Sequence, residues 1–174
     1  IQAMGETVNE LDLEQRPHQN HNKIKAIRIL VVDDHPVVRF GLSGQLNAQP
    51  GFTVVGEASN CEECCQNLPT YAPDVVLLDR ELGDASGLDA LSQLRRIDPN
   101  MPTIVYTAHG TDWRVVEAIK TGVQGYLMKN VPIDTVFEAI RVVHQGGSYL
   151  DPAVTSKAMG AVGRRSEKKA GGTF

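Results

Sequence analysis

Short hydrophobic runs alternate along this chain with longer segments in which apolar residues recur at helical spacing. Such runs are typical of buried parallel strands; they occupy residues 27–32, 52–58, 75–78, 103–107 and 125–129. Apolar positions three and four residues apart predict amphipathic helices; these cover about residues 36–46, 61–68, 87–97, 112–120 and 133–145. Strands and helices that alternate through short loops indicate right-handed βαβ units and a parallel sheet covered on both faces.

Five such units predict an α/β fold, a flavodoxin-like (βα)5 doubly wound parallel sheet with strand order 2-1-3-4-5. We assign residues 23–150 to this domain. Residues 1–22 are polar with few large apolar side chains, so we expect a disordered N-terminal tail. Residues 151–174 carry the basic pairs Arg164-Arg165 and Lys168-Lys169 among Gly, Ser and Ala. We expect them to form a linker-like C-terminal tail with a short helical stretch from Val154 to Met159.

Composition limits the classes of partner. A length of 174 residues favours one domain, and a hydrophobic content of 41% indicates that part of the chain lies outside the core. The net charge of −4 argues against nucleic-acid binding by this chain alone, because that needs a basic face. The sequence has no apolar run near the roughly 20 residues that span a bilayer and no signal peptide. We therefore expect a cytoplasmic protein without a membrane partner.

The cysteines form one cluster. Cys61, Cys64 and Cys65 fall on one face of a predicted helix, and no second pair of Cys or His follows at zinc-site spacing. We favour buried, reduced thiols over metal or redox chemistry.

Polar residues end four of the five predicted strands. Asp33-Asp34 follows the first strand, Asp79 the third, Thr107 ends the fourth and Lys129 ends the fifth. Each alone has an ordinary explanation as a loop or surface residue. Because the carboxyl ends of parallel strands share one edge of a sheet, the set together predicts a functional site there.

The chemistry of this set indicates an aspartyl-phosphate site. Three converging carboxylates repel one another unless a cation neutralises them, and dense oxygen ligands suit Mg²⁺. A bound Mg²⁺ leaves positions for a phosphoryl donor and neutralises charge during transfer to a carboxylate. Lys129 can supply a second positive charge to the transferred group, and Thr107 can offer it a hydroxyl.

With these residues in place, the sequence resembles a two-component response-regulator receiver domain. The motifs are Asp33-Asp34, Asp79, Gly87, Thr107-Ala108 and Gly125-Tyr126-Leu127-Met128-Lys129, and the resemblance runs from about residue 25 to 150. The segments 31–39 and 147–154 look most like the NarL/FixJ subfamily. The resemblance implies that a sensor histidine kinase or phosphotransfer protein phosphorylates Asp79.

The resemblance also assigns the metal ligands. It implies that Asp34 and Asp79 bind Mg²⁺ directly, Asp33 through water and Glu81 through its backbone carbonyl, and that Lys129 pairs with the phosphate.

A switch and an output surface follow from the same resemblance. Thr107 would turn to the phosphate and Tyr126 would change rotamer; the structural alternative for Tyr126 is a half-buried aromatic on an edge strand. The output surface would be the fourth helix, fifth strand and fifth helix, with Trp113, Val116 and Ile119 on or near it. Trp113 is either a core anchor or an exposed contact. A homodimer is compatible with the resemblance.

Several positions depart from common receivers. Arg80 stands where an aliphatic residue is usual, Gly83 where proline is frequent, and Asn130 where many receivers have proline after a cis bond. Glu81 and His109 lie two residues beyond Asp79 and Thr107, at positions that the resemblance links to the lifetime of the phosphoryl group.

Two alternatives and one absence remain. A phosphatase of the haloacid-dehalogenase type also forms an aspartyl phosphate. That family has an Asp as general acid two residues after the nucleophile, where this chain has Glu81, so we expect that the protein is not an enzyme. A pseudo-receiver, a binding module that is never phosphorylated, is the other alternative.

Nothing after Met159 resembles the helix-turn-helix of NarL/FixJ regulators. We favour truncation at the linker over a receiver with another output, so DNA binding is expected only through a missing output domain.

Overall fold

The computed structural model describes residues 24–83, 85–110 and 112–160, with the backbone alone at 85, 86, 112 and 113. A six-stranded parallel sheet runs through it in the order β2-β1-β3-β6-β7-β8. Its strands are β1 (Ile27–Val32), β2 (Phe52–Ala58), β3 (Val75–Leu78), β6 (Thr103–Thr107), β7 (Gly125–Met128) and β8 (Tyr149–Leu150). The helices are α1 (Pro36–Ala48), α2 (Cys61–Tyr71), α3 (Gly87–Ile97), α4 (Asp112–Lys120) and α5 (Ile133–His144).

The doubly wound fold and the order of its first five strands are confirmed, but the sheet has one strand more than predicted. β8 pairs in parallel with β7 and places Leu150 opposite Tyr126. A separate two-stranded hairpin, β4 (Glu81–Leu82) with β5 (Ala85–Ser86), was also not predicted. Strands of two residues are too short to give a recognisable hydrophobic pattern. Because of β8, β7 lies inside the sheet rather than at its edge.

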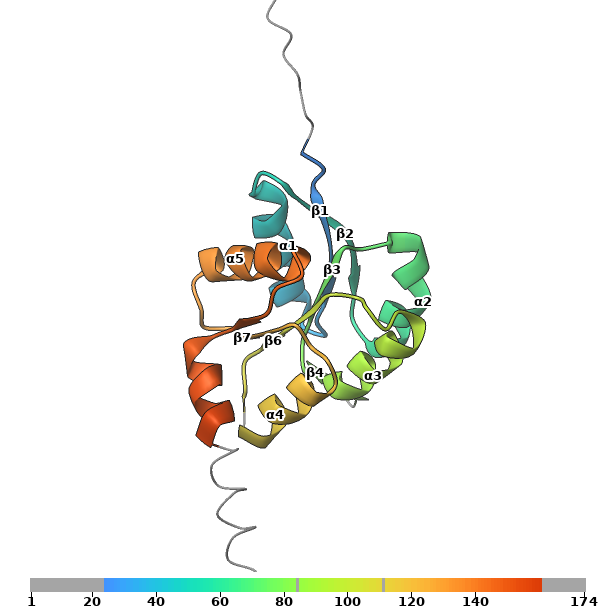
Figure 1. The fold of residues 1–174 in the computed structure, drawn as a ribbon. Coiled ribbons are helices and arrows are strands. Elements are labelled where there is room, and N and C mark those ends of the chain that lie inside the picture. The colour runs from blue at the N-terminus through green and yellow to red at the C-terminus, as the bar shows by residue number, and fades with distance from the viewer. Residues whose placement is uncertain (1–23, 84, 111, 161–174) are drawn as a thin grey trace, which may run out of the picture.

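Helices cover both faces of the sheet (Figure 1). Alternate residues of β1 point to opposite faces, with Ile29 and Val31 beside α1 and α5 and Leu30 and Val32 beside α2 and α3. Both sets are at most 1% exposed. Because these strands are buried on both faces, their sequences are continuously hydrophobic.

The cysteines pack as predicted at two of their three positions. Cys61 and Cys64 are buried and Cys65 is half-buried, and all three are free thiols. Burial raises the pKa of Cys61 to about 11 and that of Cys64 to about 12. Such thiols are protonated and unreactive at neutral pH.

The short helix that we predicted within the C-terminal tail, from Val154 to Met159, is present and is slightly longer than predicted. Residues 152–160 are helical, and the Asp151 carboxylate accepts the N–H of Ala153 at 2.9 Å. Val154 is fully buried against Val105 and Val115. This segment therefore packs on the folded domain. The expected N-terminal tail, residues 1–22, and the last part of the expected C-terminal tail, residues 161–174, lie outside the described residues. Among the described helices, none has the length and hydrophobicity of a membrane span.

Candidate functional site: an acidic cluster at the carboxyl edge of the sheet

Lys129 joins two carboxylates that come from different strands. Asp33 follows β1 and Asp79 follows β3, and these two strands are neighbours in the sheet. Lys129 follows β7, and its Nζ donates to Asp33 Oδ2 at 2.6 Å and to Asp79 Oδ2 at 2.8 Å. The convergence of these three side chains, predicted from the ends of their strands, is observed.

The Asp33 and Asp79 carboxylates are buried, and the Lys129 ammonium offsets part of their negative charge. Asp33 is 2% and Asp79 4% exposed. Burial raises the pKa of Asp79, and hydrogen bonds from Lys129 and from the Glu81 N–H offset part of that rise. Burial acts to lower the pKa of Lys129, but its two carboxylate partners outweigh burial and raise it. The ammonium is thereby held in its charged form between the carboxylates.

The two carboxylate oxygens of Asp34 differ in their partners. Oδ2 accepts the backbone N–H of Gly83 at 2.9 Å. The buried Oδ1 accepts no hydrogen bond from the described residues; it lies 2.8 Å from Nδ1 of His35, which is a cation only when the imidazole is protonated. A buried anionic oxygen that accepts no hydrogen bond is costly, so a cation at this point would be stabilising.

The donor set around this oxygen fits a divalent cation. Asp33, Asp34, His35 and Asp79 each offer one ligand atom, and these atoms all lie within 4.8 Å of one another. Three carboxylates suit Mg²⁺, which prefers oxygen ligands, better than a softer metal. The Glu81 side chain is not in this group, which is compatible with its predicted role through the backbone carbonyl.

Two neighbours of Asp33 were not predicted as part of the site. The backbone N–H of His35 donates to Asp33 Oδ1 at 2.8 Å, and Nη1 of Arg39 donates to the backbone carbonyl of Asp33 at 2.6 Å. Only their position shortly after the Asp-Asp pair could have indicated them, because the fold of the loop decides where each points.

The structure explains why Gly83 replaces the proline that is frequent at this position in receivers. Gly83 has φ +60°, whereas proline is fixed near −65°. Its N–H also donates to Asp34, and proline has no such donor. The other departure after the cluster, Asn130, follows a trans bond, since the described residues contain no cis peptide bond.

Thr107 is buried next to the cluster, but its hydroxyl is engaged within its own loop. Oγ1 donates to the His109 carbonyl at 3.2 Å and accepts the His109 N–H at 3.3 Å. The Thr107 carbonyl accepts the Lys129 N–H at 2.8 Å, so the backbone of the two residues is directly joined. No hydrogen bond between Thr107 and Asp79 is found among the described residues.

Tyr126 is fully buried, which corrects the alternative of a half-buried aromatic on an edge strand. β8 covers that side of β7, and the ring packs with Val105, Val115 and Val154. Burial raises the pKa of Tyr126, and its hydroxyl has no hydrogen-bond partner among the described residues. The side chain of Trp113, the other aromatic considered, lies outside the described residues.

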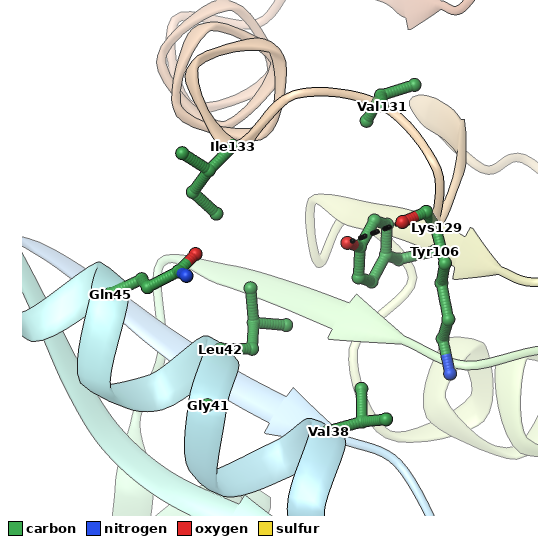
Figure 2. A pocket seen from close by; sticks show the side chains of 8 residues that line it. All are labelled: Val38, Gly41, Leu42, Gln45, Tyr106, Lys129, Val131 and Ile133. Carbon is green, nitrogen blue, oxygen red and sulfur yellow. Dashed lines mark hydrogen bonds between the residues drawn. The ribbon is translucent and has the colours of Figure 1, made fainter.

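A pocket of about 410 Å³ adjoins the cluster on the α1 side. Figure 2 shows Val38, Leu42 and Gln45 of α1 on one wall and Tyr106 and Lys129 on the other. The Tyr106 hydroxyl donates to the Lys129 carbonyl at 3.5 Å. Lys129 thus lines this pocket and also binds the carboxylates of Asp33 and Asp79.

Comparison with known proteins identifies one family. The family model for the response regulator receiver domain matches residues 29–141. The chain is 35% identical over 136 residues to the transcriptional regulatory protein DegU of Brevibacillus brevis, covering 78% of this chain and 56% of DegU. It is 30% identical over 142 residues to the response regulator protein VraR of Staphylococcus epidermidis, covering 82% of this chain and 68% of VraR.

Solved structures give the same likeness. A LuxR-family two-component response regulator from an Aurantimonas species superposes with a TM-score of 0.75 at 27% identity, covering 79% of this chain and 98% of that one. The receiver domain of the putative response regulator NarL from Mycobacterium tuberculosis gives 0.61 at 26% identity, covering 67% and 98%. The chain spans only 56% of DegU, the more similar of the two relatives named.

Proposed function

Since this chain belongs to the response regulator receiver family, we propose that Asp79 is the phosphoacceptor of a two-component pathway. Members of this family are signalling domains rather than enzymes, and they imply a histidine kinase partner. The observation that carries the proposal is the Lys129 ammonium, hydrogen-bonded to both Asp33 and Asp79 beside an acidic cluster. In the proposed pathway a sensor histidine kinase or phosphotransfer protein meets the receiver in the cytoplasm.

The proposed transfer breaks the N–P bond of a phosphohistidine and forms an O–P bond to an Asp79 carboxylate oxygen. Asp33, Asp34 and Asp79, with the Glu81 backbone carbonyl, would hold Mg²⁺. When bound, Mg²⁺ neutralises phosphoryl charge during transfer. The carboxylates raise the pKa of Lys129, so its ammonium is already protonated and would donate to the phosphoryl oxygens.

The proposed response is a shift between two arrangements of the loop after β6. A phosphoryl oxygen on Asp79 would accept the Thr107 hydroxyl, which now donates to His109. Tyr126 would follow, and its unsatisfied hydroxyl supports a role in that rearrangement. The output surface would be α4, β7 and α5, with half-buried Val116 and 38%-exposed Ile119 near it.

The phosphodonor protein is proposed to dock beside α1. Val37 and Phe40 are 84% and 82% exposed, and α1 begins two residues after Asp34. Large exposed apolar side chains next to a reactive site are typical of a protein contact. Regulation of transcription and a homodimer belong to the proposed full-length protein, and a relative named as a transcriptional regulatory protein supports the first.

Intact-mass measurement after incubation with acetyl phosphate and Mg²⁺ tests the proposal. We expect one labile phosphoryl adduct on the wild type and none on Asp79→Asn. Asp134→Asn, an exposed carboxylate on α5, is the matched control and should be phosphorylated like the wild type. Absence of the adduct from the wild type would overturn the proposal in favour of a pseudo-receiver.

A further inference from the structure

Arg80 joins the loop after the phosphoacceptor to the loop after Thr107. Its side chain is 5% exposed. Nε donates to the backbone carbonyl of His109 at 3.1 Å, and Nη2 donates to Glu81 Oε1 at 2.7 Å. One guanidinium therefore links groups that belong to different loops.

Arg80 hydrogen-bonds one oxygen of the Glu81 carboxylate, and the other oxygen faces the His109 imidazole. Glu81 Oε1 binds Arg80, and Glu81 Oε2 lies 3.6 Å from Nδ1 of His109. The backbone N–H of Glu81 donates to Asp79 Oδ1 at 3.2 Å. A carboxylate on a residue that directly contacts the acceptor is thus kept turned toward Arg80 and His109.

The position of that carboxylate matters for loss of a phosphoryl group. In hydrolysis, a water oxygen attacks phosphorus, the P–O bond to Asp79 breaks, and the water gives its proton to a base. The products are the Asp79 carboxylate and inorganic phosphate. A carboxylate that is free to approach the water can take this proton, whereas one engaged with a guanidinium is a weaker and displaced acceptor.

We propose that Arg80 is a positioning residue that prolongs the life of the aspartyl phosphate by holding the Glu81 carboxylate away from the attacking water. The inference rests on the proposed phosphorylation of Asp79. Arginine suits this role because its planar guanidinium presents donors to two acceptors at once, whereas the single ammonium of a lysine cannot match that geometry. An aliphatic residue, the usual occupant in receivers, offers no donor at all.

The test measures how fast phosphorylated protein loses its adduct once acetyl phosphate has been removed. Arg80→Met should speed the loss by about fivefold or more, since a freed carboxylate can then act as a base, for which factors of roughly 10²–10⁴ are typical at full alignment. Arg80→Met combined with Glu81→Gln should return to within about twofold of the wild type, because the amide cannot accept the proton. Arg80→Lys should fall between wild type and Arg80→Met.

Arg95→Met is the matched control. Arg95 is a part-buried arginine that also donates to backbone carbonyls, those of Met101 and Gly122, away from the acidic cluster. Its adduct should have the wild-type lifetime, and far-ultraviolet circular dichroism checks that each variant folds.

Two results would overturn the inference: an Arg80→Met adduct as long-lived as that of the wild type, or a double variant as short-lived as Arg80→Met. Both results can be observed only if wild-type Asp79 forms the adduct, so neither result contradicts the proposed function. Failure of the wild type to form the adduct would instead refute the proposed function.

Discussion

Two polar side chains near the carboxyl end of β7, the half-buried Lys129 and the fully buried Tyr126, are held in opposite ways. Lys129 donates to the carboxylates of Asp33 and Asp79, so its charge is matched. Tyr126 is 0% exposed, but its hydroxyl has no partner within the described part of the chain. Charge pairing fixes the first side chain, whereas apolar packing with Val105, Val115 and Val154 fixes the second.

The difference indicates how the two regions respond to change. A change of charge at Asp79, by phosphorylation or by a bound cation, acts directly on the partners of Lys129. Burial of the Tyr126 hydroxyl without a partner costs about 1–3 kcal/mol, which the packing of the ring must offset. Hydrogen bonds therefore hold the Lys129 side chain in place, whereas no hydrogen bond among the described residues holds the Tyr126 hydroxyl.

Removal of the Lys129 charge should give the largest effect on stability. Lys129→Met leaves two buried carboxylates without their cation. We expect the free energy of unfolding to fall by about 2–3 kcal/mol, less than for a fully enclosed pair because the Lys129 side chain is 16% exposed. Urea unfolding measures this, with Lys120→Met, an exposed lysine of α4, as the control. An unchanged midpoint would show that the carboxylates do not need the ammonium.

Replacement of Asp79 should raise the free energy of unfolding rather than lower it. Burial raises the pKa of Asp79, so the folded state favours its protonated form and loses stability as pH rises through that raised pKa. Asp79→Asn should therefore increase the free energy of unfolding at pH 7.

The pH dependence supplies the internal control for Asp79→Asn. Its gain should disappear below the ordinary aspartate pKa of 3.8, where Asp79 is neutral in both the folded and the unfolded state. A gain that persists in acid would mean that its source is not the charge of Asp79. A loss of stability at pH 7 would mean that Lys129 stabilises the Asp79 carboxylate more strongly than burial opposes it.

The smallest effect is expected at Tyr126. Tyr126→Phe removes an unsatisfied hydroxyl and keeps the ring, so stability should stay the same or rise by up to about 1 kcal/mol. Thr103→Val is the contrasting control, because the buried Thr103 hydroxyl donates to the Met101 carbonyl at 3.0 Å and its loss should cost about 1 kcal/mol. Thermal unfolding compares the two. A loss at Tyr126 as large as at Thr103 would reveal a hydrogen-bond partner for the tyrosine.

Sequence was most informative where a residue's position follows from the end of a strand. Asp33, Asp79 and Lys129 directly follow β1, β3 and β7, and parallel strands bring their carboxyl ends to one edge. It was least informative for contacts between loops. The Arg80 link to His109 joins residues 29 positions apart, and nothing in either local pattern marks the pairing.

By itself, the sequence determined the alternation of strands and helices, the order of the first five strands and the acids and lysine that gather at one edge. These follow from hydrophobic periodicity and strand direction, which are local properties. Only the tertiary structure decided that β8 closes the side of β7, that Tyr126 is fully buried, that His35 joins the acidic cluster and that Arg80 holds Glu81. Each of these depends on the path of a loop, which is set by packing and hydrogen bonds with distant residues.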